Sequence, residues 1–386
     1  MKKVVLIALA VGLLALPVMA QVEAGAGKIT IHANIDFLGK YIAEDKDNGV
    51  MQIEDFIIRD TVLSLGGELS DKVSWELTSQ WTAIPLSTVT ATLVGTTVTL
   101  VPTSAHQSAP QLLTAKINLK LIPMTTISVG RFLPDQSPSL QYHILSNVHT
   151  IYFPMLAGGP NYGMGENPAL TLLKGWNPLP PLLLVPGFQT GAQAKIGNDT
   201  AHVSLGWFNG TQGGQGIGNF EETDASKAGL VKVGLKIKGV VVGGSWWDEY
   251  VNNLQKSGGS DDLRLTIYDF YLGFSREKFH VLAEYAENNI DWLDKGVPNL
   301  KQNDWYVQAG VSPIKALEVV ARYEFADYVD LARDDYKYDE ETWTTIGVNY
   351  FLLEKNAAIA LQYIIKDHDE LDANTNEWDL LFEVNL

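Results

Sequence analysis

Eleven charged residues, spread over alternating segments of the chain, have types and positions that could act on a passing solute or ion. Six are lysines on the polar faces of earlier segments, namely Lys116, Lys120, Lys195, Lys232, Lys236 and Lys238. Five are carboxylates on the polar faces of later segments, namely Glu284, Glu318, Glu324, Asp379 and Glu383. If these segments surround an aqueous space, they form a basic arc and an acidic arc. The field between the arcs would orient dipolar solutes and impose a modest ion preference, although any wet lumen also needs charged walls.

Signals for enzymatic or metal chemistry are weak. The histidines form no HExxH pair, no GxSxG segment is present, and the chain has no cysteine. The glycine-rich run 163–166 lies between Pro160 and Pro168 and opens no helix that could supply amide donors to a phosphate. We therefore expect no enzyme, no cofactor and no metal site.

The stretch 133–187 differs from the rest of the chain. It holds nine of the sixteen prolines, six glycines and only three charged residues, Asp135, Glu166 and Lys174. Such a composition excludes a regular helix or a central strand, and a loop of this length in a compact domain has a function. We expect it to fold into a barrel mouth and set the pore diameter. The candidate constriction residues are Tyr142, His143, His149, Tyr152, Phe153, Tyr162, Glu166, Lys174 and Trp176.

Segments with a two-residue period lie on both sides of this loop. In 29–37, for example, Ile29, Ile31 and Ile35 alternate with polar residues. The same alternation predicts sixteen strands, which are 29–37, 51–68, 73–82, 113–121, 125–132, 188–196, 201–209, 230–238, 240–250, 263–274, 279–287, 305–311, 316–328, 343–351, 357–366 and 377–386.

The connections between these strands alternate between short turns and long loops, such as 43–50, 83–110, 133–187 and 328–342. This order is typical of an outer-membrane barrel, in which strands alternate apolar residues outside with polar residues inside. We predict an all-β fold: one 16-stranded antiparallel transmembrane β-barrel over 21–386, whose long third outer loop folds into the pore.

A secreted β-sandwich also has alternating strands. Two features favour the barrel: the regular order of short and long connections, and aromatic residues near strand ends, where interfacial girdles would lie. These aromatic residues are Tyr41, Trp81, Trp207, Trp246, Trp247, Tyr250, Trp305, Tyr328, Trp343 and Trp378.

Composition and the first residues restrict the location and the partners. Lys2 and Lys3, an apolar run and a small-residue site at 18–20 predict a secretory signal peptide over 1–20, cleaved before Gln21. The formal net charge of −17 argues against a nucleic-acid partner, because binding to phosphates needs a basic face. The loops 43–50, 211–228, 251–262, 329–340 and 367–376 are acidic and could bind divalent cations that bridge to lipopolysaccharide, or could simply be a solvated surface.

Several short runs also resemble a known family. They are 127–134 (Ile-Ser-Val-Gly-Arg-Phe-Leu-Pro), 207–210, 283–285, 305–310, 321–324 and 346–350, in order along the chain. Together they resemble the bacterial porins of the phosphate-selective O and P type. The resemblance implies a sixteen-stranded barrel, a homotrimer and a third outer loop that narrows the channel; 133–187 is the third outer loop in the alternation.

Two features depart from that family. Its phosphate-selective members share a ladder of lumenal arginines, whereas this chain has six arginines in all, and the chain ends in Leu386 rather than an aromatic residue. The sequence therefore predicts an outer-membrane porin for small hydrophilic solutes or ions, with phosphate, other anions, cations and neutral molecules all open as solutes. The alternative is a barrel that is not a channel, such as an adhesin, a receptor or a structural protein, with its lumen blocked by the central loop.

Overall fold

The structure is a computed structural model. It describes residues 21–24, 27–42, 53–81, 84–94, 97–107, 110–138, 188–210, 227–256, 259–292, 300–328, 340–352, 357–368 and 375–385. The predicted signal peptide, loop residues 139–187 and Leu386 lie outside these ranges. None of the described residues belongs to a helix long and apolar enough to cross a membrane.

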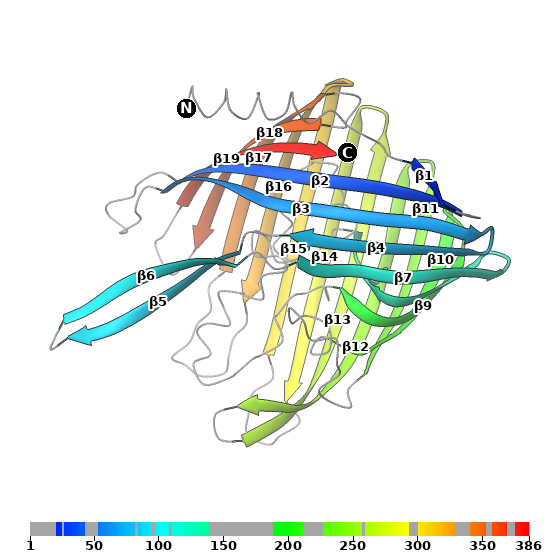
Figure 1. The fold of residues 1–386 in the computed structure, drawn as a ribbon, viewed down its shortest axis with the longest axis horizontal. Coiled ribbons are helices and arrows are strands. Elements are labelled where there is room, and N and C mark those ends of the chain that lie inside the picture. The colour runs from blue at the N-terminus through cyan, green and yellow to red at the C-terminus, as the bar shows by residue number, and fades with distance from the viewer. Residues whose placement is uncertain are drawn as a thin grey trace.

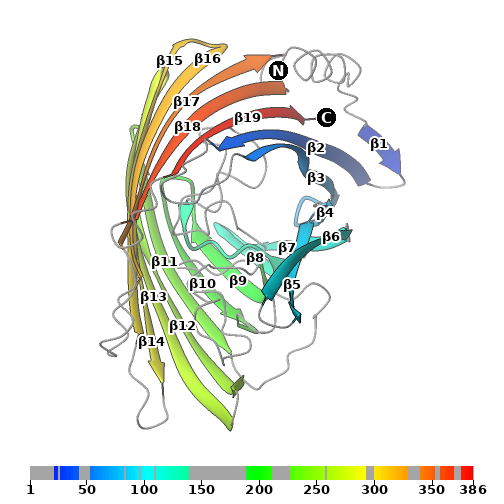
Figure 2. The same ribbon diagram turned by 90° about the vertical axis from the view of Figure 1, so that its left-hand side faces the viewer.

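Sixteen strands within the described ranges form one antiparallel sheet that closes on itself (Figures 1 and 2). In chain order they are β2 (Gly27–Ile42), β3 (Ile53–Ser70), β4 (Val73–Trp81), β7 (Pro110–Ile122), β8 (Thr125–Phe132), β9 (Gln189–Gly197), β10 (Ala201–Phe208), β11 (Ala228–Ile237), β12 (Val240–Lys256), β13 (Gly259–Arg276), β14 (Phe279–Trp292), β15 (Leu300–Ile314), β16 (Leu317–Tyr328), β17 (Glu340–Leu352), β18 (Ala357–His368) and β19 (Thr375–Asn385). The predicted sixteen-stranded barrel is confirmed.

The last strand closes the ring against the first. β19 pairs with β2 from Glu377 opposite Ile42 to Asn385 opposite Asn34. Beyond that point the short strand β1 (Gln21–Ala24) pairs with the beginning of β2. The edge of β2 therefore has partners from both ends of the described chain.

Polarity across the wall is the reverse of that in a water-soluble protein. On β13, Leu272 is 57% exposed on the outer face, whereas Asp269 is fully buried on the inner face. The same inversion recurs on β16, where Val319 and Tyr323 are exposed and Arg322 is buried. Because lipid solvates apolar side chains, an apolar exterior around a polar interior is the pattern of a membrane-spanning barrel and not of a sandwich.

Short turns connect the strands at one end of the barrel. Lys238 and Gly239 form a two-residue turn between β11 and β12, and both have positive φ, +49° and +89°. Such a pair matches the right-handed twist of the flanking strands, which explains why the hairpin is tight. Lys238, predicted on a strand, therefore lies in a turn.

The expected loop 83–110 is partly regular structure. It contains β5 (Ile84–Val94) and β6 (Thr97–Gln107), which pair only with each other within the described residues. Figure 1 shows this hairpin projecting away from the barrel wall. The prediction of a plain loop was wrong because threonine alternates with valine and leucine here, a pattern with high β propensity.

Two other expected boundaries differ from the structure. The turn expected at Ser312 and Pro313 lies at 315–316, because β15 continues past a register irregularity to Ile314. The expected loop 251–262 is mostly strand, since β12 extends to Lys256 and β13 begins at Gly259. The strands of the wall therefore differ in length: β12 and β13 have 17 and 18 residues, whereas β8 and β10 have 8 residues each (Figure 2).

Two of the aromatic residues expected at the lipid interface point inward. Trp247 is fully buried beside Phe208, with ring centroids 5.4 Å apart, and Trp343 is buried beneath Lys366. Strand-end position alone cannot distinguish the two faces, because neighbouring residues such as 246 and 247 face opposite sides. Trp207, Trp246, Trp378, Tyr41 and Tyr250 are exposed, in agreement with the prediction.

A single arginine placed on the outer face of the barrel tests the position of the apolar band. We expect Leu272→Arg to lower the free energy of unfolding by about 2–4 kcal/mol, because an arginine near the middle of the lipid-facing band is poorly solvated. Thr342→Arg, nearer the long-loop end of the outer face, should cost about 0–1 kcal/mol. Urea titration in lipid vesicles measures both, and equal losses would contradict the placement of the band.

Candidate functional site

The inner wall carries the charged residues that the sequence singled out. Lys116 forms an ion pair with Glu76 of the neighbouring strand, with Lys116 Nζ 2.9 Å from Glu76 Oε2. Lys195 and Lys236 are exposed, whereas Lys232 is only 3% exposed. Lys120 is exposed near the short-turn end of β7, and Lys238 lies in its turn. The lysines of the proposed basic arc thus differ strongly in their access to water.

Lys232 is buried because the beginning of the β8–β9 loop covers it. Asp135 Oδ1 accepts a hydrogen bond from Lys232 Nζ at 2.7 Å, and Asp135 Oδ2 accepts one from Ser204 Oγ at 2.8 Å. The backbone N–H of Asp135 donates to Gln193 Oε1 at 2.9 Å. These contacts come from three strands, β9, β10 and β11, so the loop starts by folding against the inner wall.

Two further basic groups surround the same carboxylate. Lys195 Nζ lies 3.6 Å and His202 Nε2 lies 3.5 Å from Asp135 Oδ2. Burial by itself would raise the pKa of Asp135, but the contact with His202 and the charges of Lys232 and Lys195 lower it by more. The pKa of this carboxyl therefore lies well below its ordinary value, and Asp135 is a charged anchor at neutral pH.

A second contact fixes the loop further around the barrel. Ser137 Oγ donates to Glu284 Oε1 on β14, and Tyr306 Oη on β15 donates to Glu284 Oε2 at 2.8 Å. Ser137 is fully buried and Glu284 is 2% exposed. Residues 133–138 thus run inside the barrel from the basic strands β9–β11 to the acidic strand β14. We call this segment the loop anchor.

The acidic residues singled out on later strands are all buried and face inward. Glu318 Oε2 accepts from Asn349 Nδ2 at 2.8 Å, and Glu324 Oε1 accepts from Arg322 Nε at 2.5 Å. Asp379 and Glu383 are buried on β19. Each of these carboxylates therefore faces the barrel interior but is shielded from solvent.

The partition into two arcs is incomplete in the structure. Arg322 lies among the carboxylates of β16, and Lys366 Nζ pairs with Glu377 Oε2 at 2.8 Å on β18 and β19. Glu76 in turn lies beside the basic residue Lys116. Opposite charges therefore neutralise each other locally, which weakens any field across the lumen.

Sequence reasoning missed several inward-facing residues. Asp135 was recognised only as one of the few loop charges, and Asp269, Glu249 and Asp304 were not singled out although all three are buried on inner faces. Alternation could have indicated the strand carboxylates. Nothing in the sequence pairs Asp135 with Lys232, because 97 residues separate them.

The candidate constriction residues between Tyr142 and Trp176 lie outside the described residues. Among the residues that the structure describes, no group of three or more His, Cys, Asp or Glu side chains could hold a metal ion.

Comparison with known proteins shows which solved structures have a similar fold. No family model and no curated protein matches the chain. The fold is similar to that of an anion-selective porin from Comamonas acidovorans, with a TM-score of 0.61 and 10% identity, covering 93% of this chain and all of that one. The outer membrane channel DcaP of Acinetobacter baumannii has a TM-score of 0.59 and 11% identity, and the match covers 96% of this chain and 100% of that one. A loop-deletion mutant of OmpT, an outer membrane protein of Vibrio cholerae, has a TM-score of 0.59 and 10% identity. The match covers 94% of this chain and 100% of that one. The chain has the barrel fold of outer-membrane porins.

The loop anchor gives a prediction for stability. We expect Asp135→Asn to lower the free energy of unfolding by about 3–5 kcal/mol, because it leaves Lys232 buried without its carboxylate partner. A carboxyl with a depressed folded pKa contributes stability that is complete above its unfolded pKa, near 3.8, and that is lost as the pH falls through the folded pKa. The difference between wild type and variant should therefore be constant above about pH 5 and shrink below about pH 4.

Urea titrations of the barrel in detergent at a series of pH values measure this difference. Asp199→Asn, in the exposed β9–β10 turn, is the matched control and should change little at any pH. A pH-independent loss in Asp135→Asn would contradict the charged anchor.

Proposed function

We propose that the protein is a porin of the Gram-negative outer membrane, through which small hydrophilic solutes or ions diffuse passively. The observation that carries the proposal is the inverted wall, in which charged and amide side chains of a closed sixteen-stranded ring face inward beneath an apolar exterior. A barrel that only needed to be anchored in lipid would not require a charged interior, because such groups are costly away from water. The loop anchor inside the barrel supports the role of 133–187 as the constriction.

Several further expectations belong to this proposal. The chain would be exported by a signal peptide over 1–20 cleaved before Gln21, assemble as a homotrimer, and contact outer-membrane lipid and lipopolysaccharide. One of the similar solved structures is described as trimeric. The protein would act as a channel and not as an enzyme, and it would need no cofactor.

For the solute we propose anions, phosphate among them, in preference to cations. Lys195 and Lys236 are exposed on the inner face, whereas Glu284, Glu318 and Glu324 are buried and hydrogen-bonded. An exposed ammonium attracts a passing anion more effectively than a neutralised, buried carboxylate attracts a cation. This neighbourhood of strands β9–β11 is therefore the positive side of the pathway.

A barrel that is not a channel is the second candidate. It is favoured by the burial of the inner-wall groups Lys232 and Glu284, which the loop anchor contacts through Asp135 and Ser137. An adhesin, receptor or structural protein would need no open path at this level.

Solute uptake separates the two candidates. We expect liposomes that contain the purified protein to swell in solutions of small sugars, with rates that fall as the sugar becomes larger. Shortening the loop within 139–187 should raise single-channel conductance in planar bilayers, because the loop narrows the lumen. Absence of swelling would favour the blocked barrel, and unchanged conductance would refute the constriction.

Ion preference gives an independent prediction. The double variant Lys195→Gln, Lys236→Gln should shift the reversal potential across a potassium chloride gradient toward cation preference, since it removes the exposed positive charges from the pathway. Lys278→Gln, in the exposed turn between β13 and β14, removes one positive charge away from the inner wall and should leave the reversal potential unchanged. An equal shift in both variants would contradict the assignment.

A further inference from the structure

The outer wall changes character near the long-loop ends of β12, β13 and β14. Lower on these strands the outward side chains are apolar, as in Val242, Phe270 and Leu272, all of which are exposed. Above them lie the aromatic residues Trp246 and Tyr268, which are paired across β12 and β13. Beyond this aromatic row the outward positions are polar, as in Asp248, Arg264 and Asn289, except for the exposed aromatic residue Tyr250 on β12.

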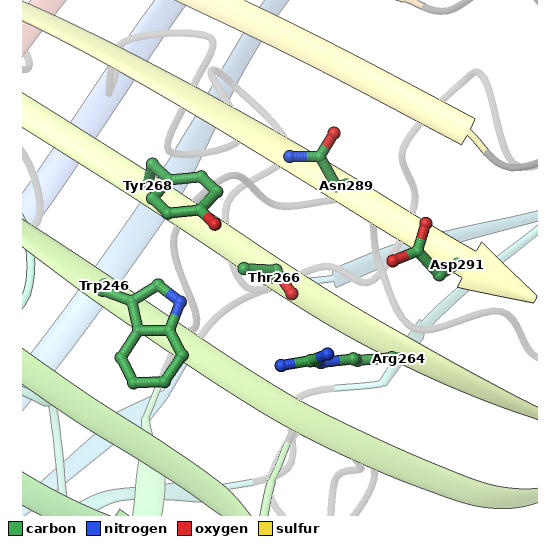
Figure 3. Close-up of a pocket in the computed structure, with 6 residues that line it drawn as sticks. All are labelled: Trp246, Arg264, Thr266, Tyr268, Asn289 and Asp291. Atoms are coloured by element: carbon green, nitrogen blue, oxygen red, sulfur yellow. The ribbon is translucent and has the colours of Figure 1, made fainter.

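A cavity of about 650 Å³ opens on this polar zone. Six side chains from the three strands line it, as Figure 3 shows, and they are Trp246, Arg264, Thr266, Tyr268, Asn289 and Asp291. We call this cavity the outer-wall pocket.

The strand register explains why a cavity forms here. Thr266 is the centre of a lattice of outward positions, with Asp248 and Asn289 opposite it on the neighbouring strands and Arg264 and Tyr268 two residues away on its own strand. Thr266 is buried although it faces outward, because the longer side chains around it rise above it. A short side chain ringed by long ones makes a pit with a polar floor.

Ion pairing holds the rim in place. Arg264 Nε donates to Asp248 Oδ1 at 2.8 Å, and Thr266 Oγ1 donates to the same oxygen at 3.2 Å. The Arg264 side chain is still 45% exposed, and a guanidinium has five N–H donors. On the other side, Asn289 Nδ2 donates to Glu287 Oε1 at 3.0 Å, which orients the Asn289 amide.

The chemistry of the lining selects one class of ligand. Two adjacent aromatic rings offer a flat apolar surface, while carboxylate, amide, hydroxyl and guanidinium groups offer donors and acceptors at its edge. A sugar ring has this pair of properties, with C–H groups on its faces and hydroxyls around its rim. A phosphate fits less well, because the cation that lines the pocket, Arg264, is already paired with Asp248, and Asp291 lines the same pocket. The neighbouring Lys301, opposite Asn289, is likewise paired with Glu287.

The position of the pocket indicates where the sugar comes from. The pocket adjoins the apolar band and lies on its long-loop side. In an outer-membrane barrel the long loops are extracellular, so the pocket lies at the level of the outer-leaflet headgroups. We propose that the outer-wall pocket binds a saccharide ring in the headgroup of an outer-leaflet glycolipid. The proposal rests on the membrane insertion that the proposed function includes, and it does not depend on whether the lumen conducts.

Native mass spectrometry of the folded barrel tests the proposal. The protein is purified in lauryldimethylamine oxide, which carries no sugar, and dodecyl maltoside is titrated as the probe. We expect a bound maltoside whose affinity falls about tenfold in Asn289→Ala, because one oriented hydrogen-bonding group is lost. Thr266→Trp, which fills the floor, should abolish binding.

The matched control is Asn303→Ala. Asn303 faces outward on the neighbouring strand β15, and its Nδ2 also donates to a carboxylate, Asp327 Oδ2, at 3.1 Å, but it does not line the pocket. This variant should bind dodecyl maltoside as the wild type does. An equal loss in the Asn289 and Asn303 variants would overturn the proposal.

Two further probes identify the source of the ligand. Free maltose should bind at least tenfold more weakly than dodecyl maltoside, and dodecylphosphocholine should not compete; equal binding of either probe would overturn the assignment to a glycolipid headgroup. Single-channel conductance of Asn289→Ala should equal that of wild type. A conducting barrel that binds no maltoside would refute the pocket alone, whereas maltoside binding without conductance would refute only the channel.

Discussion

The whole structure depends on keeping backbone and charged groups away from hydrocarbon. A strand in lipid has no water to satisfy an unpaired edge, so the sheet must close, and side chains that need water must turn inward. Here the closure is made by β19 against β2, and the inward turn is visible in the burial of residues such as Asp269 beside exposed Leu272. Once both conditions are met, the interior is lined with polar groups, and the loop anchor lies against them.

The charged interior creates a second constraint, because charges brought together inside a wall must be paired. Arg322 with Glu324, Lys366 with Glu377 and Lys232 with Asp135 meet this demand. The third pair differs from the others, since Asp135 belongs to a loop and not to the wall. The loop is thus part of the electrostatic balance of the barrel, because the loop anchor both covers the Lys232 ammonium and supplies the carboxylate that neutralises it.

The fold could be predicted from the sequence to a large extent, and the site only in outline. Two-residue alternation is a local property, so the strands and their faces followed from it, as Glu318 and Glu324 illustrate. The β5–β6 hairpin was also within reach, because its alternation is as regular as that of the wall. Contacts such as Asp135 with Lys232 or Ser137 with Glu284 join distant positions through the folded loop, and no local pattern encodes them. The inward Trp247 was missed for a simpler reason, namely that its neighbour Trp246 faces the lipid.

The pairing of β2 with β19 also has a consequence for biogenesis. Asp36 lies opposite Glu383, so the first barrel strand to be synthesised receives its final neighbour from the far end of the polypeptide. Until β19 pairs with β2, the incomplete sheet has two unpaired edge strands that can pair with another extended chain. Contacts between residues so far apart in the sequence also form slowly. The unfinished sheet is therefore open to misassembly until β19 pairs with β2, and closure of the ring removes that risk.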